Sequence, residues 1–279
     1  MKKTLKAAVK KLIACSVSLM GRSAPGRYLF NRITASAMAQ TRTVTHNGVS
    51  LTFAAPNELA LARADTLSSK EPETLEWIDG LPSGSTLWDI GANVGLYTCY
   101  AAKARGCRVF AFEPSVFNLE LLARNLFLNG LTDKAVIVPL PLSEALGVSR
   151  LNMTSTDWGG AMSTFGEAYG HDGRPLRKIF EFPTIGLSMA DAANLLMIPR
   201  PDYIKMDVDG IEHLILKGGG EVLKSVKGLL IEINDEFAAQ AGGAAEFLKQ
   251  AGLTLKEKKR ADIRLTGAAE GTYNQIWVR

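Results

Sequence analysis

The sequence has few cysteines, and their spacing matches neither a metal site nor a disulfide framework. Its 279 residues include three cysteines, Cys15, Cys99 and Cys107, with no Cys-x-x-Cys pair. An odd number of widely separated cysteines disfavours both a disulfide scaffold and a zinc site. We therefore expect no metal ligands, and a reducing compartment such as the cytoplasm suits the chain.

The chain also lacks a hydrophobic run long enough to cross a bilayer. Its apolar N-terminal stretch, residues 12–20, has about half the length that a spanning helix needs. Five lysines precede or enter this stretch, which predicts a basic amphipathic helix over residues 1–20 that contacts a partner or the inner membrane surface. A solvated helix packed on the domain is the alternative. An export signal is disfavoured, because the lysines lie where its apolar region should be.

Acidic residues are missing from residues 1–57, which hold nine Lys and Arg. The rest of the chain has 23 Lys and Arg (32 less 9) against 28 Asp and Glu, a formal charge of −5. An acidic body argues against a nucleic-acid substrate, because binding to phosphates needs a basic face. We expect residues 1–57 to form an extension of a basic helix and a β-hairpin, the latter turning at Asn47–Gly48, before a domain over residues 58–279.

The most informative motif present is Thr-Leu-Trp-Asp-Ile-Gly-Ala-Asn-Val-Gly-Leu-Tyr, residues 86–97. It begins with an apolar run typical of a buried parallel strand, turns at glycine, and continues from Gly95 as a helical pattern to about Arg105. Gly91 permits a positive φ and the close approach of a ligand, and Gly95 permits close packing of strand and helix. This strand, turn and helix predict a nucleotide-like cofactor.

What the turn lacks indicates which cofactor it binds. Asn93 stands where the dinucleotide fingerprint has its second glycine, and no lysine follows Gly95 as in a phosphate-binding P-loop. Both differences disfavour a phosphate-rich ligand. Asp89 ends the strand with a carboxylate, which suits a ligand that carries an ammonium and a sulfonium group. We therefore predict S-adenosylmethionine, with helix capping as the structural alternative for Asp89.

The next strand supports this interpretation. Residues 108–114 form an apolar run that presents Glu113 at its C-terminal end, where an acid accepts hydrogen bonds from both hydroxyls of a ribose. An ordinary acid at a strand end is the alternative. In the loop after a third strand, at residues 135–140, Ser143 is placed to meet the adenine, although a structural role is as plausible for a single loop serine.

The remaining pattern alternates strands and helices, which predicts an α/β fold with a parallel sheet. We expect helices at 57–68, 71–81, 115–129 and 244–251, and strands at 203–208, 228–234, 253–257 and 272–278. Residues 144–187 interrupt this alternation with glycines and scattered aromatic residues, so we interpret them as a segment that faces the acceptor. Packing on the sheet edge is the alternative, and His171 is expected to have no catalytic role.

A second chemical motif is Tyr-Ile-Lys-Met-Asp-Val-Asp-Gly-Ile-Glu, residues 203–212. Strand alternation places Lys205 and Asp207 on one face, and a lysine there needs a partner. Asp207 is the nearest candidate and Glu232 the other. Asp207 follows the strand and should therefore face the crevice beside the cofactor. Asp209 and Glu212 fit a helix capping box, and an Asp207–Asp209 cation site is only weakly indicated.

Both motifs together resemble the FkbM family of S-adenosylmethionine-dependent methyltransferases, over residues 71–234. The resemblance includes Trp88 to Thr98, Phe112–Glu113–Pro114 with Asn118, Ile204 to Glu212, and Ile231 to Ile233. It implies a Rossmann-like fold with a seven-stranded, mostly parallel sheet, and methylation of a hydroxyl on a sugar, glycolipid, polyketide or similar small molecule. The residues predicted to bind the cofactor are Asp89, Gly91, Asn93, Gly95, Leu96, Tyr97, Thr98, Glu113, Pro114, Asn118 and Ser143.

For catalysis we nominate Asp207 as the base that takes the hydroxyl proton, with Lys205 orienting it or holding the acceptor. Two alternatives from other classes stay open. A nicotinamide-dependent oxidoreductase would bind nicotinamide, although Asn93 disfavours it. A non-catalytic scaffold would bind a membrane or partner through its basic helix and transfer no methyl group.

Overall fold

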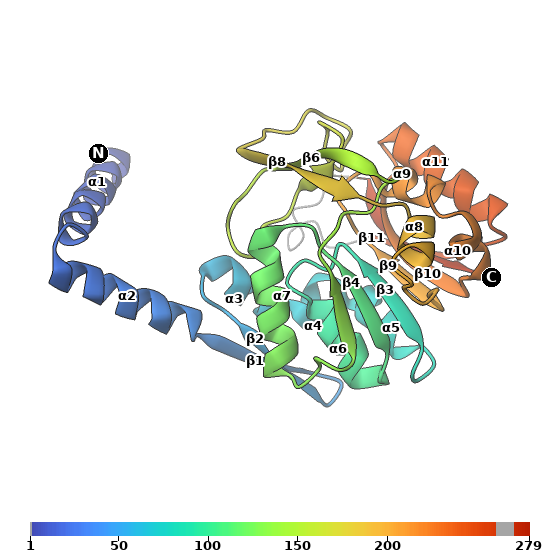
Figure 1. Cartoon of the computed structure of the whole chain (residues 1–279), viewed down its shortest axis with the longest axis horizontal. Helices are drawn as coiled ribbons and strands as arrows, with labels where there is room; N and C mark the ends of the chain where they lie inside the picture. The colour runs from blue at the N-terminus through green and yellow to red at the C-terminus, as the bar shows by residue number, and fades with distance from the viewer. Residues whose placement is uncertain (1, 261–270) are drawn as a thin grey trace.

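The computed structural model describes residues 2–260 and 271–279. A rounded α/β body is preceded by two helices that project from one side of it (Figure 1). The N-terminal elements are α1 (Lys2–Met20), α2 (Ala24–Met38), β1 (Thr41–His46), β2 (Val49–Ala54), α3 (Glu58–Asp65), α4 (Leu67–Lys70) and α5 (Pro72–Asp79). The first half of the main sheet follows, with β3 (Thr86–Ile90), α6 (Leu96–Arg105), β4 (Arg108–Phe112), α7 (Val116–Leu128) and β5 (Ala135–Val138).

The C-terminal half begins with an inserted sheet and then completes the main one. The inserted strands are β6 (Gly147–Met153), β7 (Ser163–Phe165) and β8 (Phe180–Gly186). The later elements are α8 (Met189–Asn194), β9 (Tyr203–Met206), α9 (Glu212–Lys217), α10 (Gly220–Ser225), β10 (Gly228–Asn234), α11 (Ala238–Gln250), β11 (Thr254–Arg260) and β12 (Thr272–Val278).

The main sheet has seven strands in the order β11-β12-β10-β9-β3-β4-β5. Strands β10, β9, β3, β4 and β5 pair in parallel, and β12 runs antiparallel to both β10 and β11. The predicted Rossmann-like fold is therefore confirmed, including an antiparallel last strand. The strand order reverses between β3 and β9, and the crevice beyond the carboxyl ends at such a reversal is where open α/β sheets bind ligands.

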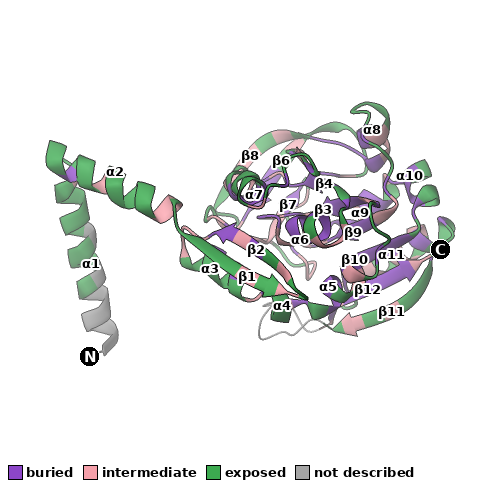
Figure 2. Cartoon of the chain, turned by 90° about the horizontal axis from the view of Figure 1, so that it is seen from below, coloured by how far each residue is buried: buried purple, intermediate pink, exposed green. Residues whose placement is uncertain are grey.

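Successive side chains of β3 pack on opposite faces of the sheet. Leu87 packs into a core with residues of α5 and α6, whereas Trp88 and Ile90 pack into a second core with residues of α8, α10 and α11. All three side chains are buried, and purple strands lie between green outer surfaces in Figure 2. With helices on both faces, the ends of the strands are the accessible part of the sheet.

Residues 144–187 are more regular than predicted. They form a three-stranded antiparallel sheet in the order β7-β6-β8, where the sequence indicated an irregular segment. Glycine, proline and polar residues break the hydrophobic alternation of these strands, so the sequence pattern did not indicate them. The insertion packs over the main sheet near its carboxyl edge, because Asn93 donates a side-chain hydrogen bond to the carbonyl of Gly160 at 2.8 Å.

The predicted hairpin at Asn47–Gly48 is confirmed, with β1 and β2 paired from Thr41–Ala54 to His46–Val49. Strand β2 is tied to α7, because the Asn125 side chain accepts a hydrogen bond from the Ala54 amide at 2.7 Å. Helix α11 begins six residues before the expected start at Ala244. Among the described residues, no helix is both long and apolar enough to cross a membrane.

Candidate functional site

The turn between β3 and α6 shapes the floor of the crevice. Gly91 has φ +81°, and a Cβ there would lie 1.9 Å from the backbone oxygen of Asp207. Its amide donates to the carbonyl of Phe112 at 3.0 Å, which holds the turn against β4. Gly95 also has φ +81°, and a Cβ there would lie 2.4 Å from Leu122 Cδ1. The strand, turn and helix predicted here are confirmed, and both glycines are required by packing as well as by φ.

Replacing Gly91 with alanine is expected to destabilise the fold more than the same change at Gly84. Both glycines have positive φ, +81° and +77°, but a Cβ at Gly84 would meet nothing within 4 Å. Each variant incurs the left-handed backbone cost of about 1–2 kcal/mol, and Gly91→Ala adds about 1–3 kcal/mol of overpacking against β9. Urea unfolding of the two variants measures the difference. Equal losses would contradict the packing role.

Glu113 lies at the end of β4 and is held by backbone amides. Its Oε1 accepts from Ser115 N and its Oε2 from Asn93 N, both at 2.8 Å. Burial raises the pKa of Glu113 to about 7, and these two amides only partly oppose the shift. The carboxyl borders a hollow that is otherwise mainly apolar, with Phe112, Leu140, Leu142, Phe165 and Ile215 among its walls and Pro114 and Asn118 beside the acid. A flat apolar ring with a neighbouring diol matches these walls.

The raised pKa of Glu113 predicts a pH-dependent stability. Between pH 4.5 and 7 the unfolded carboxyl ionises while the folded one stays protonated, so the unfolded chain binds fewer protons and stability falls as pH rises. In Glu113→Gln this decline in the free energy of unfolding, on the order of 2–3 kcal/mol in the wild type, should be absent. Urea unfolding at pH 5, 6, 7 and 8 measures it, with Glu120→Gln on the exposed face of α7 as the control. Parallel curves for wild type and Glu113→Gln would contradict the shift.

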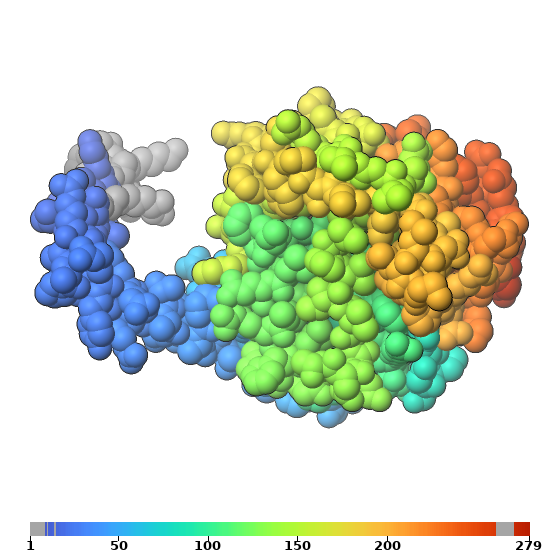
Figure 3. Space-filling view, viewed as in Figure 1, coloured from blue at the N-terminus to red at the C-terminus, as the bar shows by residue number. Residues whose placement is uncertain are grey.

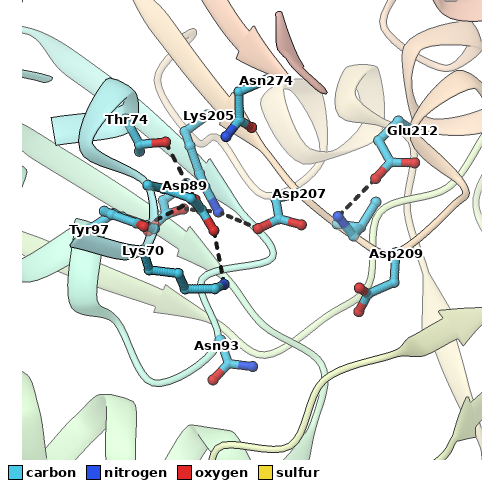
Figure 4. A network of polar contacts seen from close by, with 12 residues as sticks. Lys70, Thr74, Asp89, Asn93, Tyr97, Lys205, Asp207, Asp209, Glu212 and Asn274 are labelled. Atoms are coloured by element: carbon cyan, nitrogen blue, oxygen red, sulfur yellow. Dashed lines mark hydrogen bonds and ion pairs between the residues drawn. The ribbon is translucent and has the colours of Figure 1, made fainter. Parts of the chain in front are cut away.

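Lys205 is the buried cation at the centre of the crevice (Figure 4). Its Nζ lies 3.3 Å from Asp207 Oδ2 and 3.9 Å from Asp89 Oδ1, and 5.3 Å from the centre of the Tyr97 ring. Asp89 and Lys205 are paired across β3 and β9, so the sheet register brings them together. Burial alone would lower the pKa of Lys205, but the carboxylates of Asp207 and Asp89 outweigh it and raise that pKa.

Asp207 lies where three adjoining hollows meet, because it borders each of them together with Gly91 and Asn93. Burial would raise the pKa of Asp207, but Lys205 and then Lys70 outweigh burial and hold it below its ordinary value. Asp207 is therefore ionised throughout the neutral range. Its pairing with Lys205, predicted from strand alternation, is confirmed.

Four residues predicted to bind the cofactor do not border these hollows, namely Asp89, Gly95, Thr98 and Ser143. The side chain of Asp89 is 1% exposed, with Oδ2 accepting from Thr98 Oγ1 at 2.5 Å and Oδ1 without a hydrogen-bond partner. Burial raises the pKa of Asp89, against the opposing effect of Lys205. Ser143 donates its amide to Leu187 O and borders none of the three hollows. Asp89 therefore lies behind the wall of these hollows, and contact of Asp89, Thr98 and Ser143 with the cofactor stays a prediction.

The third hollow lies beside Leu96, Tyr97 and Lys205. Tyr97 donates its hydroxyl to Glu71 Oε2 at 3.0 Å, and Lys70 Nζ lies 2.9 Å from Glu71 Oε1. Glu71 is buried, and burial followed by its charge raises the pKa of Tyr97. No sequence motif indicates Lys70 and Glu71 as site residues. Lys70 ends the short helix α4 and Glu71 precedes α5, and both reach the crevice only through the tertiary fold.

Charges of both signs line the second hollow. Its cations are Arg63 of α3 and Lys70 of α4, and its acids are Asp207, Asp209 and Glu232. Burial, followed by the charge of Asp207, raises the pKa of Glu232 well above its ordinary value. Glu232 was considered only as a partner of Lys205, yet the register places it next to Asp207, since Ile231 pairs with Met206. His171 also borders this hollow.

The predicted capping box at Asp209 and Glu212 is wrong. Helix α9 has Ile211 at its N-cap without a side-chain hydrogen bond. Asp209, whose φ is +63°, instead accepts a hydrogen bond at 2.7 Å from the amide of Met162, a residue of the insertion. Glu212 accepts from Val208 N at 3.0 Å and from Gly210 N at 3.1 Å, in the loop before the helix. Both acids therefore shape the loop after β9.

Metal-ligand geometry does not occur in the part of the chain that the structure describes, where no group of three His, Cys, Asp or Glu residues could hold an ion. The Asp207–Asp209 pair, which the sequence indicated only weakly as a cation site, thus gains no further ligand among the described residues.

Comparison with known proteins gives one family match. The profile of the Methyltransferase FkbM domain matches residues 89–255, more than half of the chain. Hexuronic acid methyltransferase AglP of Haloferax volcanii is 26% identical over 148 residues, which are 53% of this chain and 55% of that protein. The chain thus spans about half the length of this curated relative.

Solved structures resemble the chain more distantly. Precorrin-6y C5,15-methyltransferase from Geobacter metallireducens GS-15 has a TM-score of 0.43 at 15% identity, covering 75% of this chain and 86% of that one. TYW2 of P. horikoshii, in complex with MeSAdo, has a TM-score of 0.46 at 11% identity, covering 85% and 69%. At these scores the strand order itself is the evidence for the fold.

Proposed function

The chain belongs to the FkbM family of methyltransferases, and we propose that it transfers the methyl group of S-adenosylmethionine to a hydroxyl of a sugar, glycolipid, polyketide or related small molecule. One observation carries this proposal. Three hollows adjoin at the strand-order reversal and share Gly91, Asn93 and Asp207, with Glu113 at one end and Glu232 at the other. A cofactor and an acceptor can therefore meet at Asp207.

The residues present fit S-adenosylmethionine. The apolar hollow beside Glu113 would hold the adenine, and the Glu113 carboxyl would accept from the ribose hydroxyls. The hollow beside Leu96, Tyr97 and Lys205 would hold the methionine part. Asp89 Oδ1, a buried carboxylate oxygen without a hydrogen-bond partner, lies behind that hollow and adds negative potential. When bound, the cofactor supplies a methyl group activated by a neighbouring sulfonium.

The acceptor would occupy the hollow with charges of both signs. Its cations, Arg63 and Lys70, suit an acidic group of the acceptor, and the name of the relative AglP, a hexuronic acid methyltransferase, agrees with a sugar acid. The acidic formal charge of residues 58–279 supports a small molecule or glycan in preference to nucleic acid. A nicotinamide-dependent oxidation is not supported, because the family is one of methyltransferases.

Two carboxyl groups with opposite pKa shifts divide the proton chemistry. Asp207 is held ionised by Lys205 and would accept the proton that the acceptor hydroxyl loses as the methyl–sulfur bond of the cofactor breaks and the new C–O bond forms. The lowered pKa makes Asp207 a weaker base. A weak base suffices, because the hydroxyl proton becomes strongly acidic while its oxygen gains a methyl group. The raised pKa of Glu232, caused by burial and then by the charge of Asp207, favours its protonated form, which would donate a hydrogen bond to the acceptor. Alignment of oxygen, methyl carbon and sulfur supplies much of the rate.

The direct experiment is isothermal titration of the full chain with S-adenosylmethionine, followed by methyl-transfer assays on neutral sugars and hexuronic acids. We expect saturable cofactor binding and methyl transfer to one acceptor class. No binding of the cofactor or its demethylated product at millimolar concentration would overturn the proposal.

Glu113→Ala is expected to weaken the binding of S-adenosylmethionine about 10- to 100-fold, because the ribose hydroxyls lose a buried acceptor, a loss that costs about 1–3 kcal/mol. Calorimetry measures the dissociation constant directly. Glu120→Ala, at an exposed position of α7, is the matched control and should bind as wild type. Unchanged affinity in Glu113→Ala would reject this position for the ribose.

A further inference from the structure

Helices α1 and α2 form an N-terminal arm that stands away from the body. The arm lies clear of the main sheet in both ribbon views (Figures 1 and 2), and the space-filling view shows open space between α1 and the body (Figure 3). Nearly all of its described residues are exposed. It enters the body through Gln40, whose carbonyl accepts from the Ala55 amide at 2.8 Å.

Large apolar side chains are exposed along both helices of the arm. In α1 they recur at intervals of three and four residues, which places them on one face. Their exposed fractions lie between 39% and 69%. These residues are Val9, Leu12, Ile13, Val17, Leu19 and Met20 in α1, and Tyr28, Leu29 and Ile33 in α2. Such a run of uncovered aliphatic surface marks a site of association.

The arm is also strongly basic. Residues 1–57 contain nine Lys and Arg and no Asp or Glu, in contrast to the acidic remainder of the chain. Lys11 in α1 and Arg32 in α2 are exposed on the same helices as the apolar side chains. Exposed cations beside exposed aliphatic groups are complementary to a surface of anionic headgroups over acyl chains.

The elbow between the two helices is built by specific packing. A Cβ on Gly26 would lie 1.8 Å from the carbonyl oxygen of Met20, so only glycine allows this approach. Ser23 caps α2 by accepting from Gly26 N at 3.1 Å, and its hydroxyl donates to Met20 O at 3.1 Å. The angle of the arm is therefore set by the fold, and the exposed side chains are presented as a preformed unit.

We propose that the N-terminal arm docks the enzyme on an anionic lipid bilayer, with α1 and α2 lying on the surface and their aliphatic side chains inserted among the headgroups. Residues 12–20 are too few to cross a bilayer, so the arm rests on the surface. An acidic protein would satisfy the cations but would not need nine exposed apolar side chains, and nucleic acid would leave them exposed to water. The proposal is independent of the methyl-transfer chemistry.

Vesicle co-sedimentation of the full chain tests the proposal. We expect binding to vesicles of phosphatidylcholine with 30% phosphatidylglycerol that is at least about tenfold tighter than to phosphatidylcholine alone, and weaker in 0.5 M NaCl. The variant Lys11→Gln/Arg32→Gln should bind about 25-fold more weakly, at about fivefold per cation. Leu12→Ser/Leu19→Ser should bind at least about tenfold more weakly.

Matched controls come from the body. Phe127→Ser/Val148→Ser removes two apolar side chains that are each 74% exposed, and Lys103→Gln removes an exposed lysine. These variants should bind as wild type. Equal binding to neutral and anionic vesicles, unchanged binding of the arm variants, or capture of an acidic protein with no vesicle binding would overturn the proposal.

Cys15 provides a second readout that does not depend on substitutions in the arm. It is exposed in α1, whereas Cys99 and Cys107 are buried, so a thiol-reactive, environment-sensitive dye should label it selectively. With anionic vesicles the emission should shift to the blue and increase. The same dye at Phe127→Cys in a Cys15→Ser background should not respond. A response at position 127 but not at Cys15 would place the membrane contact on the body and reject the arm.

Discussion

Lys205→Met is expected to destabilise the fold by about 3–5 kcal/mol, the loss typical of breaking a buried charge pair. Asp89 is 1% exposed and its Oδ1 already lacks a hydrogen-bond partner, so removal of the nearby ammonium leaves a buried negative charge with no cation beside it. Methionine has a similar volume, and packing is therefore largely retained. The loss should come from electrostatics and from the contact of Lys205 with the Tyr97 ring.

Chemical unfolding of Lys205→Met and Lys227→Met side by side measures this effect. Lys227 pairs with Asp202 at 2.7 Å but is 62% exposed, so its replacement should cost less than about 1 kcal/mol. The double variant Lys205→Met/Asp89→Asn neutralises the more deeply buried of the two acids beside Lys205, and it should recover part of the lost stability. If the two single lysine variants lost the same stability, Lys205 would have no special role in the site.

Asp207→Asn is expected to lower kcat by about 10²- to 10⁴-fold, because an amide of the same shape cannot accept the hydroxyl proton. Affinity for S-adenosylmethionine should change much less, since an amide of the same shape preserves the walls that Asp207 contributes to the hollows, and Glu113 is unchanged. The substitution also removes the carboxylate nearest to Lys205, whose Nζ lies 3.3 Å from Asp207 Oδ2. Circular dichroism at the assay temperature must therefore show that it is folded, so that the lost turnover is attributed to chemistry.

Comparison with Glu232→Gln separates the two carboxyl groups. Glutamine retains a hydrogen-bond donor, so this variant should keep much of its turnover at neutral pH. The wild-type rate should fall as rising pH ionises Glu232, whereas the rate of Glu232→Gln should show no such fall. Asp207→Asn should be inactive across the whole pH range. Near-normal turnover of Asp207→Asn with loss of turnover in Glu232→Gln would exchange their assigned roles.

Local regularities made the first half of the site predictable. The apolar run, the glycine turn and the helix of residues 86–105 lie within one continuous segment, and Glu113 ends the next strand, so their order along the chain already implies neighbouring positions in a parallel sheet. Gly91 and Glu113 accordingly border the predicted crevice. Strand alternation also predicted the pairing of Lys205 with Asp207, because Asp207 directly follows the strand that contains Lys205.

Other parts of the site depend on contacts between distant segments. Arg63 and Lys70 lie on short helices that carry no motif, and they reach the crevice because β2 and α7 hold that region against the sheet. Asp209 and Glu212 match a capping box in sequence, yet Met162 and the loop amides take their oxygens. A tertiary partner, once present, competes with local capping, and sequence spacing gives no sign of it.

The sequence alone determined four features, because each depends on neighbours within a few residues. These are the order of elements, the glycine turn, the acids at strand ends, and the charge contrast between residues 1–57 and the rest. The fold decided which carboxylates face a ligand and which face the interior. Asp89 is placed behind the wall because β3 and β9 pair Asp89 with Lys205, and Glu232 reaches the crevice because β10 lies beside β9. Burial and charge pairing set the pKa of each acid, and both are properties of the surroundings that only the packed chain creates.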